Sequence, residues 1–118
     1  MAFVYKQLYA TTTIAASNVA IVTNTTGKKY IRTVIFYNYH ATNPVNVKLF
    51  NVAAGGSGVP ANQIFGTNVA GETNLDPGQT VIWEIPIPGL VLETNGATLQ
   101  VWASAGTTAN VTVIGAEE

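Results

Sequence analysis

The sequence contains no cysteine, one histidine and few charged residues, and each of these shortages excludes a class of function. Without cysteine the chain forms no disulfide, no cysteine-ligated zinc site and no iron–sulfur cluster. A single histidine, His40, supplies no multi-histidine metal site, and its position before Thr42-Asn43-Pro44 predicts a solvated hairpin tip. We therefore expect no metal and no cofactor.

Charged residues make up 9% of the chain, against about 25% in an average globular protein. Such a surface is either coated with Thr, Asn, Ser and Gln or covered by partners, and we keep both readings. The net charge is −1 and the only basic cluster is Lys28, Lys29 and Arg32, which is too small to predict nucleic-acid binding.

Catalytic patterns are also missing. The acids, Asp76-Pro77-Gly78 among them, show no pairing motif of a glycosidase, and no serine lies in G-x-S-x-G. The Gly55-Gly56-Ser57-Gly58 run lacks the Lys-Ser/Thr ending of a phosphate loop, so we interpret it as a flexible loop. We expect no catalytic residue, no small-molecule substrate and no enzymatic activity.

Long apolar runs are absent as well. No window approaches the roughly 18 apolar residues of a membrane helix, and the N-terminus does not match a signal peptide. We therefore expect a protein without membrane association that is made and matured in a cytoplasm.

What the sequence does have is apolar alternation with a period of two, typical of β-strands. In residues 30–39, Ile31, Thr33, Ile35 and Tyr37 are expected on one face, and Arg32, Val34, Phe36 and Asn38 on the other. Similar alternation occurs around residues 45–52, 80–85, 99–103 and 111–114, and a shorter strand is expected near Ile64–Val69. Turn residues separate these runs, as in His40–Pro44, Asp76–Gly78 and Asn95-Gly96. The 118 residues are therefore predicted to form one all-β domain, a β-sandwich of jelly-roll-like type.

Residues 1–18 are expected to form an N-terminal arm followed by a loop. Phe3–Tyr9 alternate and can either pair in the sheet or reach out, whereas Thr11–Asn18 predict a loop or an irregular crossover. Val52–Pro60 predict an exposed excursion. Phe50 and Trp102 fall on faces that otherwise look polar, which makes them candidate interface anchors.

Three parts of the chain resemble small β-sandwich structural proteins of tailed-bacteriophage virions. The first is similar to a G-K-x-x-x-I-x-x-V-x-x-x-N pattern followed by V-x-V-x-L, with two residues instead of three between Lys28 and Ile31; the matching residues are Gly27, Lys28, Ile31, Val34, Asn38, Val45, Val47 and Leu49. A P-G-x-T turn, L-x-V-x-A-S-A and V-x-V-x-G-x-E follow, in Pro77, Gly78, Thr80, Leu99, Val101, Ala103, Ser104, Ala105, Val111, Val113, Gly115 and Glu117. The resemblance covers about three-quarters of the chain and omits Val52–Asn74.

The resemblance implies a capsid decoration (cement) protein at the virion surface, assembled in the bacterial cytoplasm. Its implied partners are the major capsid protein and copies of itself, with a trimer favoured. The candidate contact residues are Phe3, Tyr5, Leu8 and Tyr9 in the arm, with Trp102 as an anchor. The alternative is a carbohydrate- or receptor-binding β-sandwich of a phage tail or fibre, which the aromatic residues and the Gly55–Gly58 loop favour.

Overall fold

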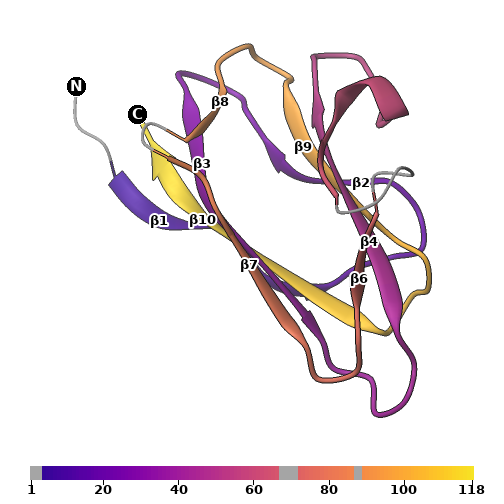
Figure 1. Ribbon diagram of the computed structural model, residues 1–118. Helices are drawn as coiled ribbons and strands as arrows, with labels where there is room; N and C mark the ends of the chain where they lie inside the picture. The colour runs from indigo at the N-terminus through magenta and orange to yellow at the C-terminus, as the bar shows by residue number, and fades with distance from the viewer. Residues whose placement is uncertain (1–3, 67–71, 87–88) are drawn as a thin grey trace.

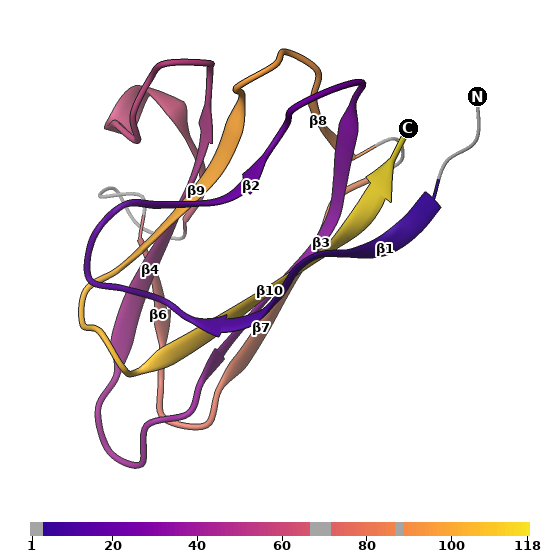
Figure 2. The same cartoon turned by 180° about the vertical axis from the view of Figure 1, so that it is seen from behind.

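The computed structural model describes residues 4–66, 72–86 and 89–118, and they form two antiparallel β-sheets packed face to face. Figures 1 and 2 show the two layers from opposite sides. The strands are β1 Val4–Thr13, β2 Val19–Thr23, β3 Lys29–Asn38, β4 Val45–Val52, β5 Gln63–Phe65, β6 Thr73–Leu75, β7 Thr80–Glu84, β8 Leu90–Leu92, β9 Thr98–Ala103 and β10 Ala109–Glu117. One short 3-10 helix, η1 Pro60–Asn62, precedes β5. The prediction of an all-β sandwich is confirmed.

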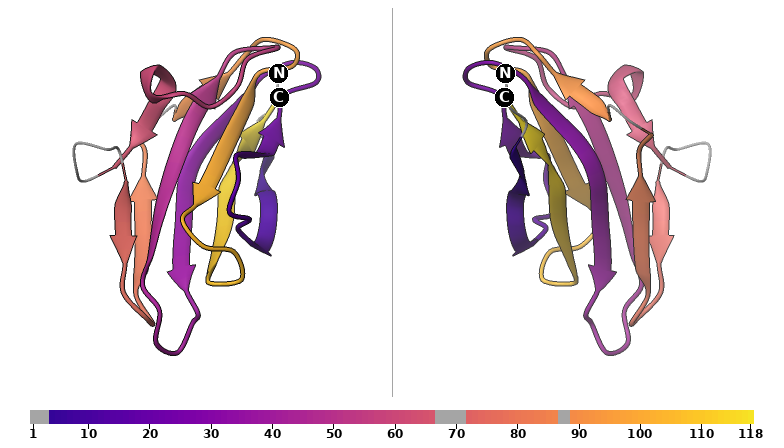
Figure 3. Two further views of the ribbon diagram at one scale, coloured as in Figure 1. Left: turned by 90° about the vertical axis from the view of Figure 1, so that its right-hand side faces the viewer. Right: turned by 90° about the vertical axis from the view of Figure 1, so that its left-hand side faces the viewer.

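Each sheet has five strands. Sheet A has the order β1-β10-β3-β7, with β8 also paired to β3; sheet B has the order β2-β9-β4-β5, with β6 also paired to β4. Figure 3 shows the sandwich along its sides, where β6 and β7 lie at the same flank of the two layers. The start of β1 and the C-terminus lie at one end, because Val4 is paired with Glu117.

The core lies between the sheets and consists of side chains that alternate inward. The central strands supply most of the fully buried groups, among them Val34, Phe36, Val47, Leu49, Leu99, Val101, Val111 and Val113. An aromatic cluster closes the flank near β5 and β7: the Phe36 and Phe65 rings stack at 5.5 Å, and Trp83 lies 5.2 Å from Phe65. The alternation seen in the sequence thus separates core from surface.

Strand β3 departs from the predicted alternation at one residue. Ile31 is fully buried with Val34 and Phe36, although the period of two places it on the face of Thr33. The pairing with β10 slips here, because Thr33 pairs with Ile114 and Ile31 pairs with Gly115. Arg32 is the extra residue of this β-bulge, which moves Ile31 to the core side.

Two other predictions differ from the structure: the hairpin tip at His40 is wrong, and the loop or crossover predicted for Thr11–Asn18 is found only at residues 14–18. Residues 39–44 join β3 in sheet A to β4 in sheet B, so His40 lies in a crossover rather than at a hairpin tip. Thr11–Thr13 belong to β1, and only residues 14–18 form the crossing loop to β2. The short strand predicted at Ile64–Val69 is found at Gln63–Phe65, and residues 67–69 lie outside the described part.

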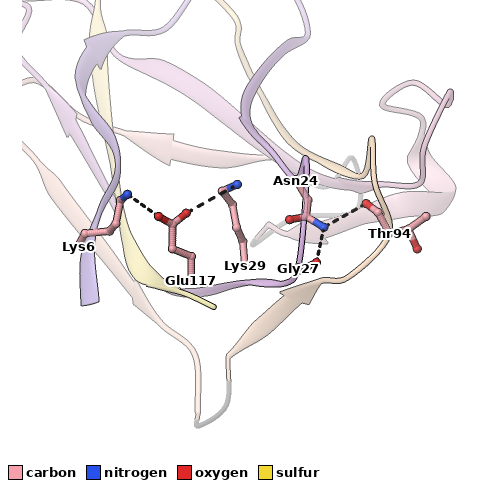
Figure 4. A network of polar contacts seen from close by, with 6 residues as sticks. All are labelled: Lys6, Asn24, Gly27, Lys29, Thr94 and Glu117. Carbon is pink, nitrogen blue, oxygen red and sulfur yellow. Dashed lines mark hydrogen bonds and ion pairs between the residues drawn. The ribbon is translucent and has the colours of Figure 1, made fainter. Parts of the chain in front are cut away.

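Buried asparagines hold the crossovers at the two ends of the sandwich. Asn38 is fully buried; its Nδ2 donates to the carbonyl oxygens of Asn43 and Leu75, and its Oδ1 accepts from the His40 amide. Asn24, also fully buried, donates to the carbonyl oxygens of Gly27 and Thr94 (Figure 4). Each side chain hydrogen-bonds backbone groups in or beside a crossover.

We predict that Asn38→Ala lowers the free energy of unfolding by about 2–4 kcal/mol, because one part-buried amide and two carbonyls lose their partner. Asn18→Ala is the control: Asn18 is exposed and its Nδ2 makes one bond, to the Gly58 carbonyl, so its loss should stay below about 1 kcal/mol. Urea unfolding followed by circular dichroism measures both. Equal losses for the two variants would contradict the role given to Asn38.

Candidate functional site

The N-terminal residues form the outer strand of sheet A, which is one of the two placements expected for Phe3–Tyr9. From Val4 onward β1 pairs with β10, and the pairing shifts between Gln7 and Tyr9 and again between Tyr9 and Thr12. Phe3 lies outside the described residues. Tyr5 is 68% exposed, whereas Leu8 and Tyr9 are half-buried and pack against the core. Of the candidate contact residues in β1, Tyr5 is therefore the available one.

An ion network ties the start of β1 to the end of the chain. The Lys6 Nζ donates to Glu117 Oε1 at 2.5 Å, and the Lys29 Nζ lies 3.8 Å from Glu117 Oε2 (Figure 4). The hydrogen bond and charge of Lys6, aided by Lys29, hold the pKa of Glu117 below its usual value. One carboxylate thus bridges β1, β3 and β10.

Trp102 lies on the outer face of sheet B and is half-buried. It pairs with Lys48 across β4 and β9, and the Lys48 Nζ lies over the Trp102 ring, 4.6 Å from its centre. This cation–π contact occupies one face of the indole ring. Trp102 and the N-terminal residues lie on different sheets, so the structure does not bring them into one site.

Phe50 shares that outer face but is 4% exposed, so it is not available as an interface anchor. The Gly58 segment covers it: a Cβ on Gly58 would lie 2.9 Å from the Phe50 ring and 2.8 Å from Asn18 Nδ2. The Gly58 amide also donates to Gln100 Oε1 on β9. The segment predicted to be an exposed excursion is exposed at residues 53–57 and 59–60, and it folds back over sheet B at Gly58.

The outer face of sheet A is the main surface that the sequence did not identify. We define the sheet A face as the outward residues of three adjacent strands: Thr33, Ile35 and Tyr37 on β3, Thr80, Ile82 and Glu84 on β7, and Asn110, Thr112 and Ile114 on β10. Ile82 is 57% exposed, Tyr37 41% and Ile114 37%. Glu84 is the one charged member. The alternation in each strand indicated which of its residues face outward. Only the strand order β10-β3-β7 shows that these residues form one surface.

One edge of this face contains a hollow of about 500 Å³, lined by Arg32, Thr33, Glu84, Ile85 and Pro86. The Arg32 Nε donates to the Ile85 carbonyl at 3.3 Å, and the Ile85 amide donates back to the Arg32 carbonyl. Within residues 4–66, 72–86 and 89–118, neither Arg32 nor Glu84 forms an ion pair.

His40 has a structural role in the β3–β4 crossover. Its Nδ1 accepts the amides of Thr42 and Asn43 at 3.1 and 3.0 Å, so the ring caps the turn. The described part of the chain groups no three metal-ligating side chains. It also contains no helix of sufficient length and apolarity to span a membrane.

Comparisons with known proteins return nothing that matches this chain: no family model, no curated protein and no solved structure is significantly similar to it. None of them links the chain to phage structural proteins.

We predict that Gly58→Ala destabilises the protein by about 1–3 kcal/mol, because the added Cβ meets the Phe50 ring and forces the segment away from sheet B. Gly106→Ala is the control, since the nearest atom to its added Cβ is 3.9 Å away. Chemical denaturation gives both values. A neutral Gly58→Ala would show that the segment does not depend on this close approach.

We also predict a pH-dependent contribution from Glu117. Its pKa is lower in the folded chain, so its stabilisation is present above the ordinary glutamate pKa of about 4.3 and is lost as pH falls through the lowered value. Wild type should melt at a higher temperature than Glu117→Gln at pH 7, and the two should converge near pH 2.5.

Glu93→Gln is the matched control, because Glu93 is largely exposed and its one ion pair among the described residues is with Lys28, at 3.7 Å. Its melting temperature should differ less from wild type at pH 7. A Glu117→Gln difference that stays constant between pH 7 and pH 2.5 would refute the ion-network argument.

Proposed function

We propose that this chain is a non-enzymatic virion structural protein, a capsid decoration protein that self-associates and bridges major capsid protein subunits of a tailed phage. The observation that carries the proposal is the sheet A face, an exposed apolar surface on a rigid sandwich. The resemblance in Gly27–Leu49, Pro77–Thr80 and Leu99–Glu117 supports the phage setting.

The composition of the sheet A face suits a protein partner. Three of its exposed side chains are large and apolar, Tyr37, Ile82 and Ile114, and they share the face with threonines. Interface centres are depleted in charge and enriched in aromatic residues. Contiguous exposed apolar surface on a soluble protein typically marks an interaction site.

The rigidity of the scaffold supports a bridging role. Asn24 and Asn38 pin the crossovers at both ends, and the ion pair of Lys6 with Glu117 fastens β1. Surfaces that are ordered before binding lose less conformational entropy when a partner docks. On a repeating shell, several weak contacts made by one assembly also add through effective concentration.

The carbohydrate-binding alternative receives less support from the aromatic residues than the sequence suggested. Trp102 has Lys48 over one ring face, Phe50 is buried, and Trp83 packs into the Phe65 cluster. Stacking on sugar needs an open ring face. We therefore favour the structural role.

The test is binding of the purified protein to expanded and unexpanded capsids of the phage that carries its gene, followed by co-sedimentation. Wild type should bind expanded capsids at a fixed ratio per capsomer. Ile82→Lys should weaken binding at least tenfold, because it places a charge at the most exposed large apolar residue of the sheet A face.

Val59→Lys is the matched control, since Val59 is an exposed aliphatic residue (44%) outside the sheet A face. It should bind as wild type does. The proposal would be overturned if the wild-type protein bound neither expanded nor unexpanded capsids. If Ile82→Lys and Val59→Lys weakened capsid binding equally, the sheet A face would have no part in the proposed function.

A further inference from the structure

Arg32 and Glu84 are two opposite charges that lie around one hollow without an ionic partner in the described chain. The other basic side chains are engaged: Lys6 and Lys29 with Glu117, Lys28 with Glu93, and Lys48 with the Trp102 ring. In a chain with so few charges, this pair stands apart.

The backbone holds Arg32 at the edge of the sheet A face. Arg32 lies between the part of β3 that pairs with β8, residues 29–31, and the part that pairs with β7, residues 33–37. It is also the bulge residue opposite β10. Bulges redirect side chains, and here Arg32 lines the hollow with Thr33 and Glu84.

Neighbouring groups limit the movement of the Arg32 side chain. Its Nε is fixed by the Ile85 carbonyl, which leaves the two terminal nitrogens of the guanidinium for another acceptor. Gly89, with φ +99°, passes so close that an added Cβ would lie 2.8 Å from Arg32 Cδ. The guanidinium is therefore held in place before any partner arrives.

Glu84 is exposed at the other side of the hollow and continues the apolar face. It pairs across β7 and β3 with Thr33, which in turn pairs with Ile114 on β10. Ile82 lies two residues before Glu84 on the same strand face. A donor group, an acceptor group and an apolar patch therefore follow one another across this end of sheet A.

We propose that the sheet A face binds the same face of a second copy across a two-fold axis, with Arg32 of each copy against Glu84 of the other. This inference rests on the proposed function, whose self-association it assigns to the sheet A face; capsid binding then depends on the dimer through effective concentration, and not on direct contact of this face with the shell. It adds the identity of the partner and the charge pairs that set its orientation.

Charge complementarity carries the choice of a second copy. A free anion would meet the Glu84 carboxylate and a free cation would meet the Arg32 guanidinium, so the hollow favours a partner that presents both charges. A second copy of the chain presents both charges. When a two-fold axis relates the copies, Arg32 of each copy faces Glu84 of the other, because every contact across such an axis occurs twice. A net charge of −1 leaves little repulsion between copies.

The size of the face sets the expected strength. With strands about 4.8 Å apart and same-face residues about 6.7 Å apart, the three strands of the sheet A face offer at most about 300 Å² per copy. This is less than half the area that one partner buries in a standard interface. We therefore expect a weak dimer that forms as the protein concentration rises, and that the repeating shell strengthens.

The experiment is a charge-swap series measured by size-exclusion chromatography with light scattering, over a range of protein concentrations and without capsids. Wild type should dimerise. Arg32→Glu alone and Glu84→Arg alone should each raise the dimer dissociation constant at least tenfold, because like charges then meet across the axis.

Two complementation results identify the partner as a second copy. The double variant Arg32→Glu/Glu84→Arg should dimerise again, and an equimolar mixture of the two single variants should form heterodimers. Glu84→Arg leaves the Arg32–Ile85 bond intact, so its result stands even if Arg32→Glu unfolds, and circular dichroism checks each fold. Val59→Lys should dimerise as wild type does.

A monomer at all concentrations, a trimer, or single variants that dimerise normally would overturn the inference. These outcomes leave the proposed function separately testable, because capsid binding by wild type is measured in its own assay. A monomer that still binds capsids through Ile82 would mean that the sheet A face docks directly on the shell.

Discussion

The two-layer architecture depends on the satisfaction of backbone groups where the chain crosses from one sheet to the other. Some amides and carbonyls at these crossovers are satisfied by other backbone groups, and others take side-chain partners. Asn38 meets this need with three hydrogen bonds to backbone groups of residues 40, 43 and 75. Asn24 donates two, while its Oδ1 has no partner among the described residues, so we expect Asn38 to contribute more.

The sequence was sufficient for the fold class because burial in a sandwich follows a period of two. Val45, Val47 and Leu49 are buried as their alternation predicts, and so are Leu99 and Val101. Ile31 was misplaced because one extra residue, Arg32, shifts the register of β3. Such a slip is set by long-range pairing with β10, which local alternation does not encode.

The candidate surface was harder to predict for the same reason. Phe50 and Trp102 were found on the outer face as expected, yet the Gly58 segment covers Phe50 and Lys48 covers part of Trp102. The residues of the sheet A face come from three segments separated by tens of residues. Each segment showed its outward apolar side chain, but only the strand order places Ile35 between Ile82 and Thr112.

The bulge at Arg32 links the fold to the proposed contact. It keeps Ile31 in the core and at the same time places a cation beside Thr33, at the edge of an apolar face. Without the extra residue the alternation would have buried either Ile31 or Val34, but not both, since they lie three positions apart. The bulge that completes the core therefore also places the positive charge of Arg32 next to Glu84. These charges specify how a second copy is oriented on the apolar face, which hydrophobic contact alone does not.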